Sequence, residues 1–210
     1  MSYFHFIFHK PRGLLCQPRQ LGRRDEVCVR DSLPPGFPPV PFAGRLDADT
    51  EGLLLFSDNG KLLHALIHPS SLDDGAHVEK IYYVQCSYQT RRFSSEPLTD
   101  DEKEDLIKKA VDNMREPIDI KGSITQPALV EACDRPDFVD ADTTKNEKLE
   151  NFALTFWISV RLREGKNRQI RRLCKRANLQ VRRLIRSHLG PLALNTLKAG
   201  EGRSLTADEV

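Results

Sequence analysis

The sequence lacks any long apolar run. Its longest unbroken apolar stretches, residues 53–56 and 81–84, are four residues each, whereas a membrane-spanning helix needs about 20. The first nine residues mix histidines with apolar side chains and have no basic segment before them, so they lack the pattern of a secretory signal. We therefore expect a globular chain that has no membrane partner.

Cysteine is scarce and irregularly placed. The five cysteines are odd in number, are scattered along the chain, and never occur in a Cys-x-x-Cys spacing. This excludes a zinc ribbon and favours a reducing compartment, the cytoplasm or the interior of an organelle. The sequence also lacks a P-loop, and the pair His64 and His68 has no evident third metal ligand. We expect neither a metal site nor a cofactor.

The net charge of +2 hides an uneven distribution. Residues 95–150 carry 16 acidic and 8 basic side chains, whereas residues 151–210 carry 13 basic and 4 acidic ones. Within residues 161–186 there are 11 basic side chains and a single acid, Glu164. Apolar residues are interleaved with this block at regular spacing, so we expect it to fold and to present its charge as a surface. A folded basic surface most often binds phosphates, although a solvated face is the simpler alternative.

The spacing of apolar residues divides the chain into candidate elements. Phe4, Phe6 and Phe8 fall on one face of an alternating segment, as in a strand. Strand patterns occur at residues 3–9, 52–57, 78–86, 153–162 and 179–188. Helical patterns occur at residues 61–68, 99–114 and 168–177, the second of them opened by a Thr99–Glu102 capping box. The proline-rich residues 32–42 predict a loop, and the acidic, weakly patterned residues 117–151 predict a variable loop.

These elements predict an α+β fold. The strands do not alternate regularly with helices, and the sequence has no internal repeat. Such an order favours a central mixed, mostly antiparallel sheet flanked by helices. At a typical size of about 150 residues per domain, we expect residues 1–210 to form a single domain.

The densest group of reactive side chains lies at residues 44–55. Asp47, Asp49 and Glu51 follow one another at every second position and are bounded by glycines. The spacing fits a solvated turn before a strand. It also fits the start of an EF-hand calcium loop, but three prolines just before it would break the entering helix, and Asp58 stands where a bidentate glutamate is needed. The third interpretation is a catalytic carboxylate.

The same stretch resembles the signature of the pseudouridine synthases, G-R-L-D-x-x-T/S-x-G-L-L. Residues 80–84 resemble the K-x-Y-x-V strand of that family, and residues 164–172 resemble its E-G-K/R-N-R-Q-V/I-R-R turn and helix. Residues 183–201 resemble its closing segment, although Gly202 stands where the family usually has an aromatic residue. The four motifs occur in the family's order, and together they are most similar to the E-type enzymes of the RsuA family, which modify RNA of the large ribosomal subunit.

The resemblance implies a role for individual residues. Asp47 matches the catalytic aspartate, Tyr82 the tyrosine that stacks on the target base, and Arg171 the basic residue paired with the aspartate. Arg45 matches an arginine near the flipped nucleotide, and Leu173 a residue that lines the pocket. We expect further RNA contacts from Lys80, Lys166, Asn167, Arg168, Arg172, Arg183 and Arg186.

The resemblance also implies the reaction, the fold and the partner. The expected fold is the pseudouridine synthase catalytic fold with an RNA-binding cleft and no separate N-terminal RNA-binding domain. The expected partner is ribosomal RNA, and the expected enzyme is a monomer. Conversion of uridine to pseudouridine replaces an N-glycosidic bond by a C-glycosidic bond without net gain of atoms or electrons, so it needs no redox cofactor. The target base must first leave its stack.

Two questions stay open at the level of the sequence. An ionised Asp47 could add to the ribose at C1′ or remove the C2′ proton, and an arginine within about 4–6 Å would favour its anionic form in either case. Without the resemblance, Arg171 would be one more phosphate contact and Tyr82 a core residue. The alternative function is therefore a non-catalytic RNA-binding or ribosome-assembly factor on the same fold.

The basic block predicts that RNA binding depends on salt. Each phosphate that the protein neutralises should contribute a slope of about −0.7 to −0.9 to a plot of log affinity against log salt concentration. The measurement is a binding titration with an rRNA transcript at several ionic strengths. An affinity that does not change between low and moderate salt would contradict the assignment of residues 161–186 to an RNA-binding surface.

Overall fold

The computed structural model describes residues 3–17, 27–67, 78–88, 98–139, 154–206 and 209. They form two compact units, the first made of Met1–Lys80 with Ile185–Val210 and the second of Ile81–Leu184. The chain passes from one unit to the other within two strands, β4 (Lys80–Tyr88) and β9 (Leu179–Leu189). No helix within these described ranges is long and apolar enough to span a membrane.

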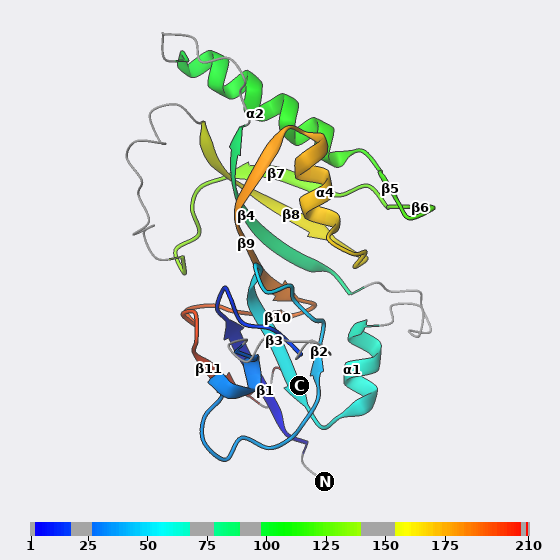
Figure 1. The fold of residues 1–210 in the computed structure, drawn as a ribbon, viewed down its shortest axis with the longest axis vertical. Helices are drawn as coiled ribbons and strands as arrows, with labels where there is room; N and C mark the ends of the chain where they lie inside the picture. The colour runs from blue at the N-terminus through cyan, green and yellow to red at the C-terminus, as the bar shows by residue number, and fades with distance from the viewer. Residues whose placement is uncertain are drawn as a thin grey trace. The chain divides into compact units, whose positions relative to one another are not determined.

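The first unit is built on a mixed sheet in the order β11-β1-β3-β9 (Figure 1). Strand β1 (His5–Lys10) runs antiparallel between β3 (Glu51–Ser57) and β11 (Gly202–Ser204). The short strands β2 (Phe42–Ala43) and β10 (Leu192–Ala193) add antiparallel pairs to β3 and β9. The parallel pair of this unit joins Glu51 to Ile185 and Gly52 to Arg186. A 3-10 turn (Val29–Ser32) and helix α1 (Gly60–Ile67) complete the unit.

Phenylalanine rings fill one side of this sheet. Phe4, Phe6 and Phe8 share one core cluster, which confirms their prediction as one face of a strand. The ring of Phe37, from the proline-rich loop, lies edge-on to Phe4, Phe6 and Phe56 at centroid distances of 5.4, 5.0 and 5.2 Å. Such edge-to-face contacts stabilise aromatic pairs beyond the burial of their area. The loop is therefore attached to the sheet through one aromatic side chain.

Gly202 has no room for a side chain. A Cβ atom at this position would lie 2.4 Å from Cε1 of the Phe6 ring and 2.8 Å from the carbonyl oxygen of Ile7. The Phe6 ring, from the neighbouring strand β1, thus occupies the space that a side chain at position 202 would need. This explains why glycine is required in a strand, where it is otherwise unfavourable.

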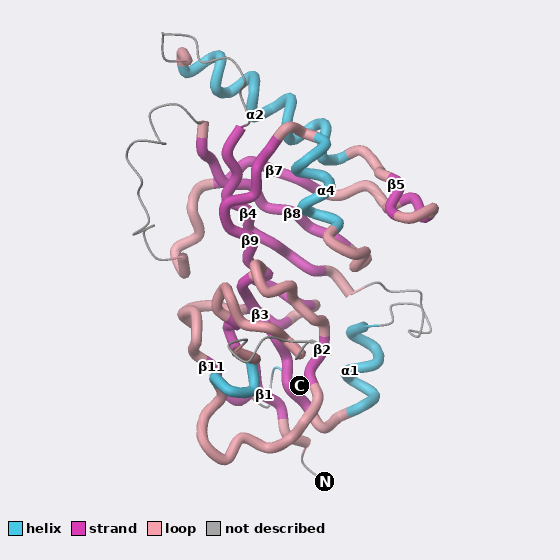
Figure 2. The backbone as a smooth tube through the Cα atoms, viewed as in Figure 1, coloured by secondary structure: helices cyan, strands magenta, loops and turns pink. Residues whose placement is uncertain are grey.

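The second unit has the strand order β9-β4-β8-β7 (Figure 2). Strand β8 (Thr155–Leu162) pairs antiparallel with β7 (Leu129–Cys133). Helices α2 (Asp100–Arg115) and α4 (Gln169–Arg176) share one hydrophobic core with this sheet. Strand β8 and helix α4 lie within the predicted strand 153–162 and the predicted helix 168–177. These two predicted ranges contribute Ile158, Val160, Leu162, Ile170, Leu173, Cys174 and Ala177 to the core.

The predicted helix boundaries hold to within about a residue. Helix α2 begins after a capping box in which the Glu102 backbone N–H donates to Thr99 Oγ1 at 3.3 Å, and the Thr99 backbone N–H donates to Glu102 Oε2 at 2.8 Å. Helix α4 is preceded by Arg168 in the left-handed region, at φ 51°, and is followed by Ala177 as its C-cap. Position 68 at the end of the first predicted helix lies outside the described residues.

The first half of the predicted variable loop, residues 117–151, contains regular secondary structure. Residues 119–124 form a small hairpin of β5 (Asp119–Ile120) and β6 (Ser123–Ile124). All five residues of β7 pair with β8, yet only Val130 is fully buried. A strand with one inward side chain has no alternation to detect. Residues 140–153, which include the start of the predicted 153–162 strand, lie outside the described residues.

The close packing at Gly202 generates a stability prediction. Gly202→Ala should lower the free energy of unfolding by about 1–3 kcal/mol, because the added methyl group must displace the Phe6 ring. The measurement is urea unfolding followed by circular dichroism. Gly60→Ala is the matched control, since a Cβ at Gly60 meets nothing within 4 Å. Equal midpoints for the two variants would contradict the packing argument.

Candidate functional site

Two glycines bound the loop that carries the three carboxylates. Gly44 has φ +67° and Gly52 has φ +121°, both in the region that disfavours side chains. A Cβ at Gly52 would lie 2.3 Å from the Arg186 carbonyl oxygen, and one at Gly44 would lie 2.8 Å from Arg186 Nη1. Both ends of the loop are therefore packed against the same residue.

Arg186 joins the two ends of this loop from inside the first unit. It is only 2% exposed. Its guanidinium donates to the Leu53 carbonyl from Nε at 3.0 Å and from Nη2 at 2.6 Å, and to the Gly44 carbonyl from Nη2 at 2.7 Å. Because a buried charge is tolerated only when it is well hydrogen-bonded, these contacts are structural. The structure thus places Arg186 in the core and not on the RNA-contacting surface predicted for it.

A second buried cation, Lys10, holds the middle of the loop. Its Nζ donates to the carbonyls of Thr50 at 2.8 Å, Pro11 at 3.0 Å and Ala48 at 3.4 Å. Burial lowers the pKa of the Lys10 ammonium below its usual 10.5, and the nearby Cys16 and acidic side chains partly oppose this. Sequence reasoning missed Lys10, because a lysine at the end of an alternating strand gives no sign that it is buried.

Backbone contacts complete the loop around Asp47. The Thr50 N–H donates to the Asp47 carbonyl at 3.0 Å, and the Gly13 N–H donates to the Ala48 carbonyl at 2.7 Å. The Leu46 N–H donates to the Cys16 thiol at 3.3 Å. With its backbone held in this way, Asp47 has an exposed side chain. The loop can therefore present one carboxylate to a ligand from a fixed backbone.

The other two carboxylates of the group differ from Asp47. Asp49 is partly buried and lies in the turn. Glu51 is instead the first residue of β3, paired with Ile185 and only 5% exposed, so a solvated turn does not describe it. Of the three acids, Asp47 is the most exposed to solvent.

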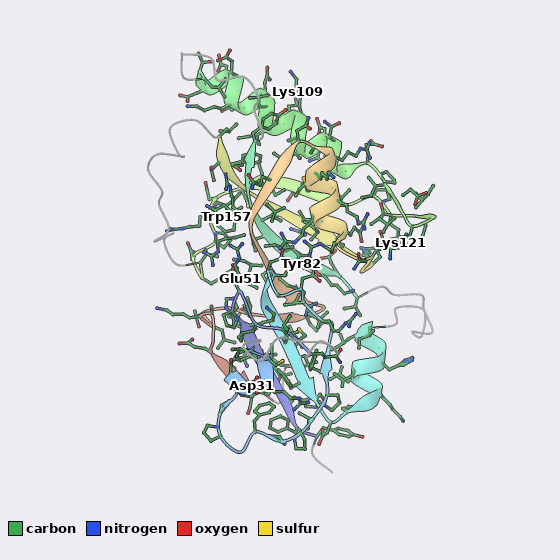
Figure 3. The ribbon with its side chains drawn as sticks, viewed as in Figure 1. Asp31, Glu51, Tyr82, Lys109, Lys121 and Trp157 are labelled. Atoms are coloured by element: carbon green, nitrogen blue, oxygen red, sulfur yellow. The ribbon has the colours of Figure 1, made fainter. Side chains whose placement is uncertain are left out.

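The remaining two residues of the predicted catalytic set belong to the second unit. Tyr82 lies in β4, half-buried and packed against the core of that unit (Figure 3). Arg171 lies in the first turns of α4 and is half-buried. Both side chains keep part of their surface open to solvent, so each could contact a ligand. Packing against this core accounts for part of the reason why a large aromatic side chain stands at position 82.

The turn before α4 is held by hydrogen bonds of its own motif residues. The Glu164 carboxylate accepts from the Gln126 N–H at 2.8 Å and from Gln169 Nε2 at 2.7 Å, and it pairs with Lys166 Nζ at 3.5 Å. Lys166 Nζ also donates to Ser123 Oγ at 2.9 Å and to the Ile124 carbonyl. These contacts fix the start of α4. They also use much of the hydrogen-bonding capacity of the Lys166 ammonium, which the sequence analysis predicts to contact RNA.

The residues predicted to bind RNA divide by exposure. Arg45, Asn167, Arg168 and Arg172 are exposed, and Lys166 and Arg183 are half-buried. Lys80, Leu173 and Arg186 are 9%, 1% and 2% exposed, so the structure gives these three little surface for a ligand. Lys80 donates to the Val78 carbonyl at 3.3 Å, and burial lowers the pKa of its ammonium.

Exposed basic side chains cover part of the second unit, as the charge pattern predicts. They are Arg161, Arg163, Arg168, Arg172, Lys175, Arg176 and Arg182. Some also make local contacts, such as Arg172 Nε to the Asn167 carbonyl at 3.2 Å and Arg176 Nη1 to the Pro117 carbonyl at 2.9 Å. Guanidinium groups retain further donors after one such bond, so this surface can still bind anions.

Comparison with known proteins gives these features a family context. The family described as RNA pseudouridylate synthase matches residues 4–176. A Vibrio parahaemolyticus protein named ribosomal large subunit pseudouridine synthase E is 29% identical over 203 residues, covering 95% of this chain and 72% of that protein. A Xanthomonas campestris protein of the same name is 29% identical over 199 residues, covering 94% of this chain and 92% of that protein.

A solved structure supports the same fold. The crystal structure of a pseudouridylate synthase superposes with a TM-score of 0.64 at 23% sequence identity, covering 99% of this chain and 72% of that one. Together with the mixed sheets and flanking helices, this likeness confirms the fold class predicted from the sequence.

The buried position of Arg186 generates a second stability prediction. Arg186→Met should lower the free energy of unfolding by about 2–5 kcal/mol, because two carbonyl groups of the loop lose their donor. Arg176→Met is the matched control, since Arg176 is an exposed arginine that donates to a backbone carbonyl, and its loss should change stability by no more than about 0.5 kcal/mol. Thermal and urea unfolding measure both. An equal, small effect of the two substitutions would show that Arg186 does not hold the loop.

Proposed function

The chain belongs to the RNA pseudouridylate synthase family, which makes it an isomerase, and we propose that it converts a specific uridine of ribosomal RNA to pseudouridine. The names of its relatives from Vibrio parahaemolyticus and Xanthomonas campestris support large-subunit rRNA as the substrate. The observation that carries the proposal is the exposed carboxylate of Asp47 on a loop held by two buried cations.

Asp47 is the proposed catalytic carboxylate. Its backbone position is set by the hydrogen bonds of Lys10 and Arg186 to the loop carbonyls. The side chain of Asp47 therefore extends from a fixed Cα position. Such preorganisation is what a reacting group needs, because misplacement by about 1 Å can cost 10²-fold in rate. The ionised carboxylate acts on the ribose of the target nucleotide, either by adding to C1′ or by removing the C2′ proton.

Tyr82 and Arg171 are proposed to act on the same nucleotide. Tyr82 offers an aromatic face to the extruded uracil, an interaction worth about 1–3 kcal/mol. Arg171 matches the family's basic residue, and a guanidinium of this kind favours the anionic form of a catalytic carboxylate. Their partial exposure supports these roles.

Extrusion of the uridine from a folded RNA requires compensation. Taking a base out of its stack costs a few kcal/mol, and phosphate contacts along the exposed basic surface of the second unit can offset it. Arg168 and Arg172 lie on that surface at the start of α4. RNA binding and base extrusion are therefore proposed to depend on the same group of cations.

Replacing Asp47 tests the catalytic assignment. Asp47→Asn should lower the rate of uridine isomerisation by at least about 10²–10⁴-fold, the range typical of an essential acid or base. RNA affinity should stay within about twofold, since the loop is held through its backbone carbonyls. The measurement is carbodiimide-dependent reverse-transcription stops on rRNA from cells that lack the protein. Asp101→Asn, an exposed carboxylate of α2, is the control and should leave the rate unchanged.

The same experiment separates an enzyme from a non-catalytic RNA-binding factor. A wild-type protein that binds rRNA but isomerises no uridine in it would favour the binding factor. Full activity of the Asp47→Asn variant would remove Asp47 from the mechanism.

Tyr82 variants test stacking against core packing. Tyr82→Phe keeps the aromatic face and should retain most of the activity, whereas Tyr82→Ala should lower kcat/KM by about 5- to 150-fold, the equivalent of a lost base stack. Kinetics on the same rRNA and thermal unfolding are measured for both variants. A loss of stability in Tyr82→Ala without a kinetic effect at a temperature where it is folded would assign Tyr82 to the core alone.

A further inference from the structure

A cavity of about 440 Å³ lies beside the Asp47 loop, entirely within the first unit. Its volume falls in the range of about 300–1,000 Å³ that is typical of small-ligand sites. Its wall comes from the residues after β1, from the 3-10 turn and from the segment around β2. The lining residues within the described part of the chain are Cys16, Gln17, Cys28, Arg30, Asp31, Pro41, Phe42 and Arg45.

Two guanidinium groups at this cavity have donors to spare. Arg45 is exposed, and no hydrogen bond or ion pair joins it to another described residue. Arg30 is exposed and uses Nη2 for one bond, to the Val40 carbonyl at 2.6 Å. Asp31, the one acid among the described wall residues, already accepts from the Cys28 N–H at 2.9 Å. The described wall residues thus carry a net positive charge, and planar guanidinium forks match the oxygens of a phosphate.

The rest of the wall suits a planar, partly polar group. Phe42 is half-buried, with its ring centroid 5.4 Å from that of Phe56, and it lines the cavity next to Pro41. Aromatic rings bind nucleobases by stacking with little preference among bases. The exposed side chain of Gln17 adds an amide that can both donate and accept. Phosphate and base recognition together indicate a nucleotide.

The position of the cavity indicates which nucleotide it binds. Arg45 precedes Asp47 by two residues, which span at most about 7 Å of chain. Another wall residue, Cys16, accepts from the Leu46 N–H between them. A ligand held by Arg45 is therefore bound by the same short loop that carries the carboxylate proposed to act on the target.

We propose that this cavity binds the RNA nucleotide next to the target uridine, through its phosphate and its base. The inference rests on the proposed function, and it makes Arg30 and Phe42 determinants of the RNA sequence or shape that is accepted. A free nucleotide has the same chemistry, so the experiment must separate the two sources.

The half-buried thiol of Cys28 reports on occupancy of the cavity. The full chain is treated with iodoacetamide in the presence of total rRNA, a single-stranded oligoribonucleotide or uridine monophosphate, and alkylation is followed by mass spectrometry. Cys133, a half-buried thiol of the second unit, is the internal control. RNA should slow the alkylation of Cys28 by about tenfold, as expected when a ligand occupies the cavity about nine-tenths of the time. The alkylation rate of Cys133 should stay unchanged.

Kinetics provide the matched test. Arg30→Gln keeps a donor but removes the charge, and should raise KM about tenfold with kcat unchanged, the equivalent of one charge-assisted hydrogen bond. Arg115→Gln is the control, because Arg115 is also an exposed arginine that donates to a backbone carbonyl, that of Val130. Its KM should equal that of the wild type.

Each outcome has a distinct meaning. Active wild-type protein with unprotected Cys28 and equal KM values for the two arginine variants would overturn the nucleotide site and leave the proposed function intact. Protection by uridine monophosphate at least as strong as by RNA would overturn the assignment to an RNA strand. If the wild type isomerises no uridine, the proposed function fails, and Cys28 protection still decides whether the cavity binds RNA.

Discussion

Two buried cations hold the loop on which the candidate active site depends. Arg186 donates to the backbone carbonyls of Gly44 and Leu53, at one end of residues 44–52 and just beyond the other, and Lys10 donates to those of Ala48 and Thr50 in the middle. These bonds go to backbone carbonyls, so they fix the loop through its backbone. Such an arrangement is costly to assemble, because a buried charge must be fully hydrogen-bonded, and it makes the loop geometry depend on the whole first unit.

In the second unit, too, some charged side chains fix the backbone while others stay exposed. In the turn before α4, Glu164 and Lys166 use their charges to attach the turn to the β6 hairpin and the segment after it. The residues that follow, Arg168 and Arg172, stay exposed. The acidic loop and the turn before α4 thus each contain side chains that face solvent and have their backbone fixed by buried or local polar side chains. A motif match identifies both kinds without distinguishing them.

The elements that the sequence predicts well have one strong apolar face. The predicted strand 153–162 and the predicted helix 168–177 both place apolar residues in one core, since burial follows the period of the element. Strand β7 was missed because it contributes Val130 alone as a fully buried side chain. The central place of Phe37 among the rings of the first unit was missed because it comes from a loop, where no periodicity exists.

The sequence alone determined the α+β class, the basic block and the group of acids that contains Asp47. Only the tertiary structure decided which charges face solvent. Arg186 and Arg172 look equivalent in a row of basic residues, yet Arg186 is buried and Arg172 is exposed. The reason is that the acceptors of Arg186, the carbonyls of Leu53 and Gly44, lie 133 and 142 positions away along the chain. No local pattern can encode a hydrogen bond whose partner is brought close by folding.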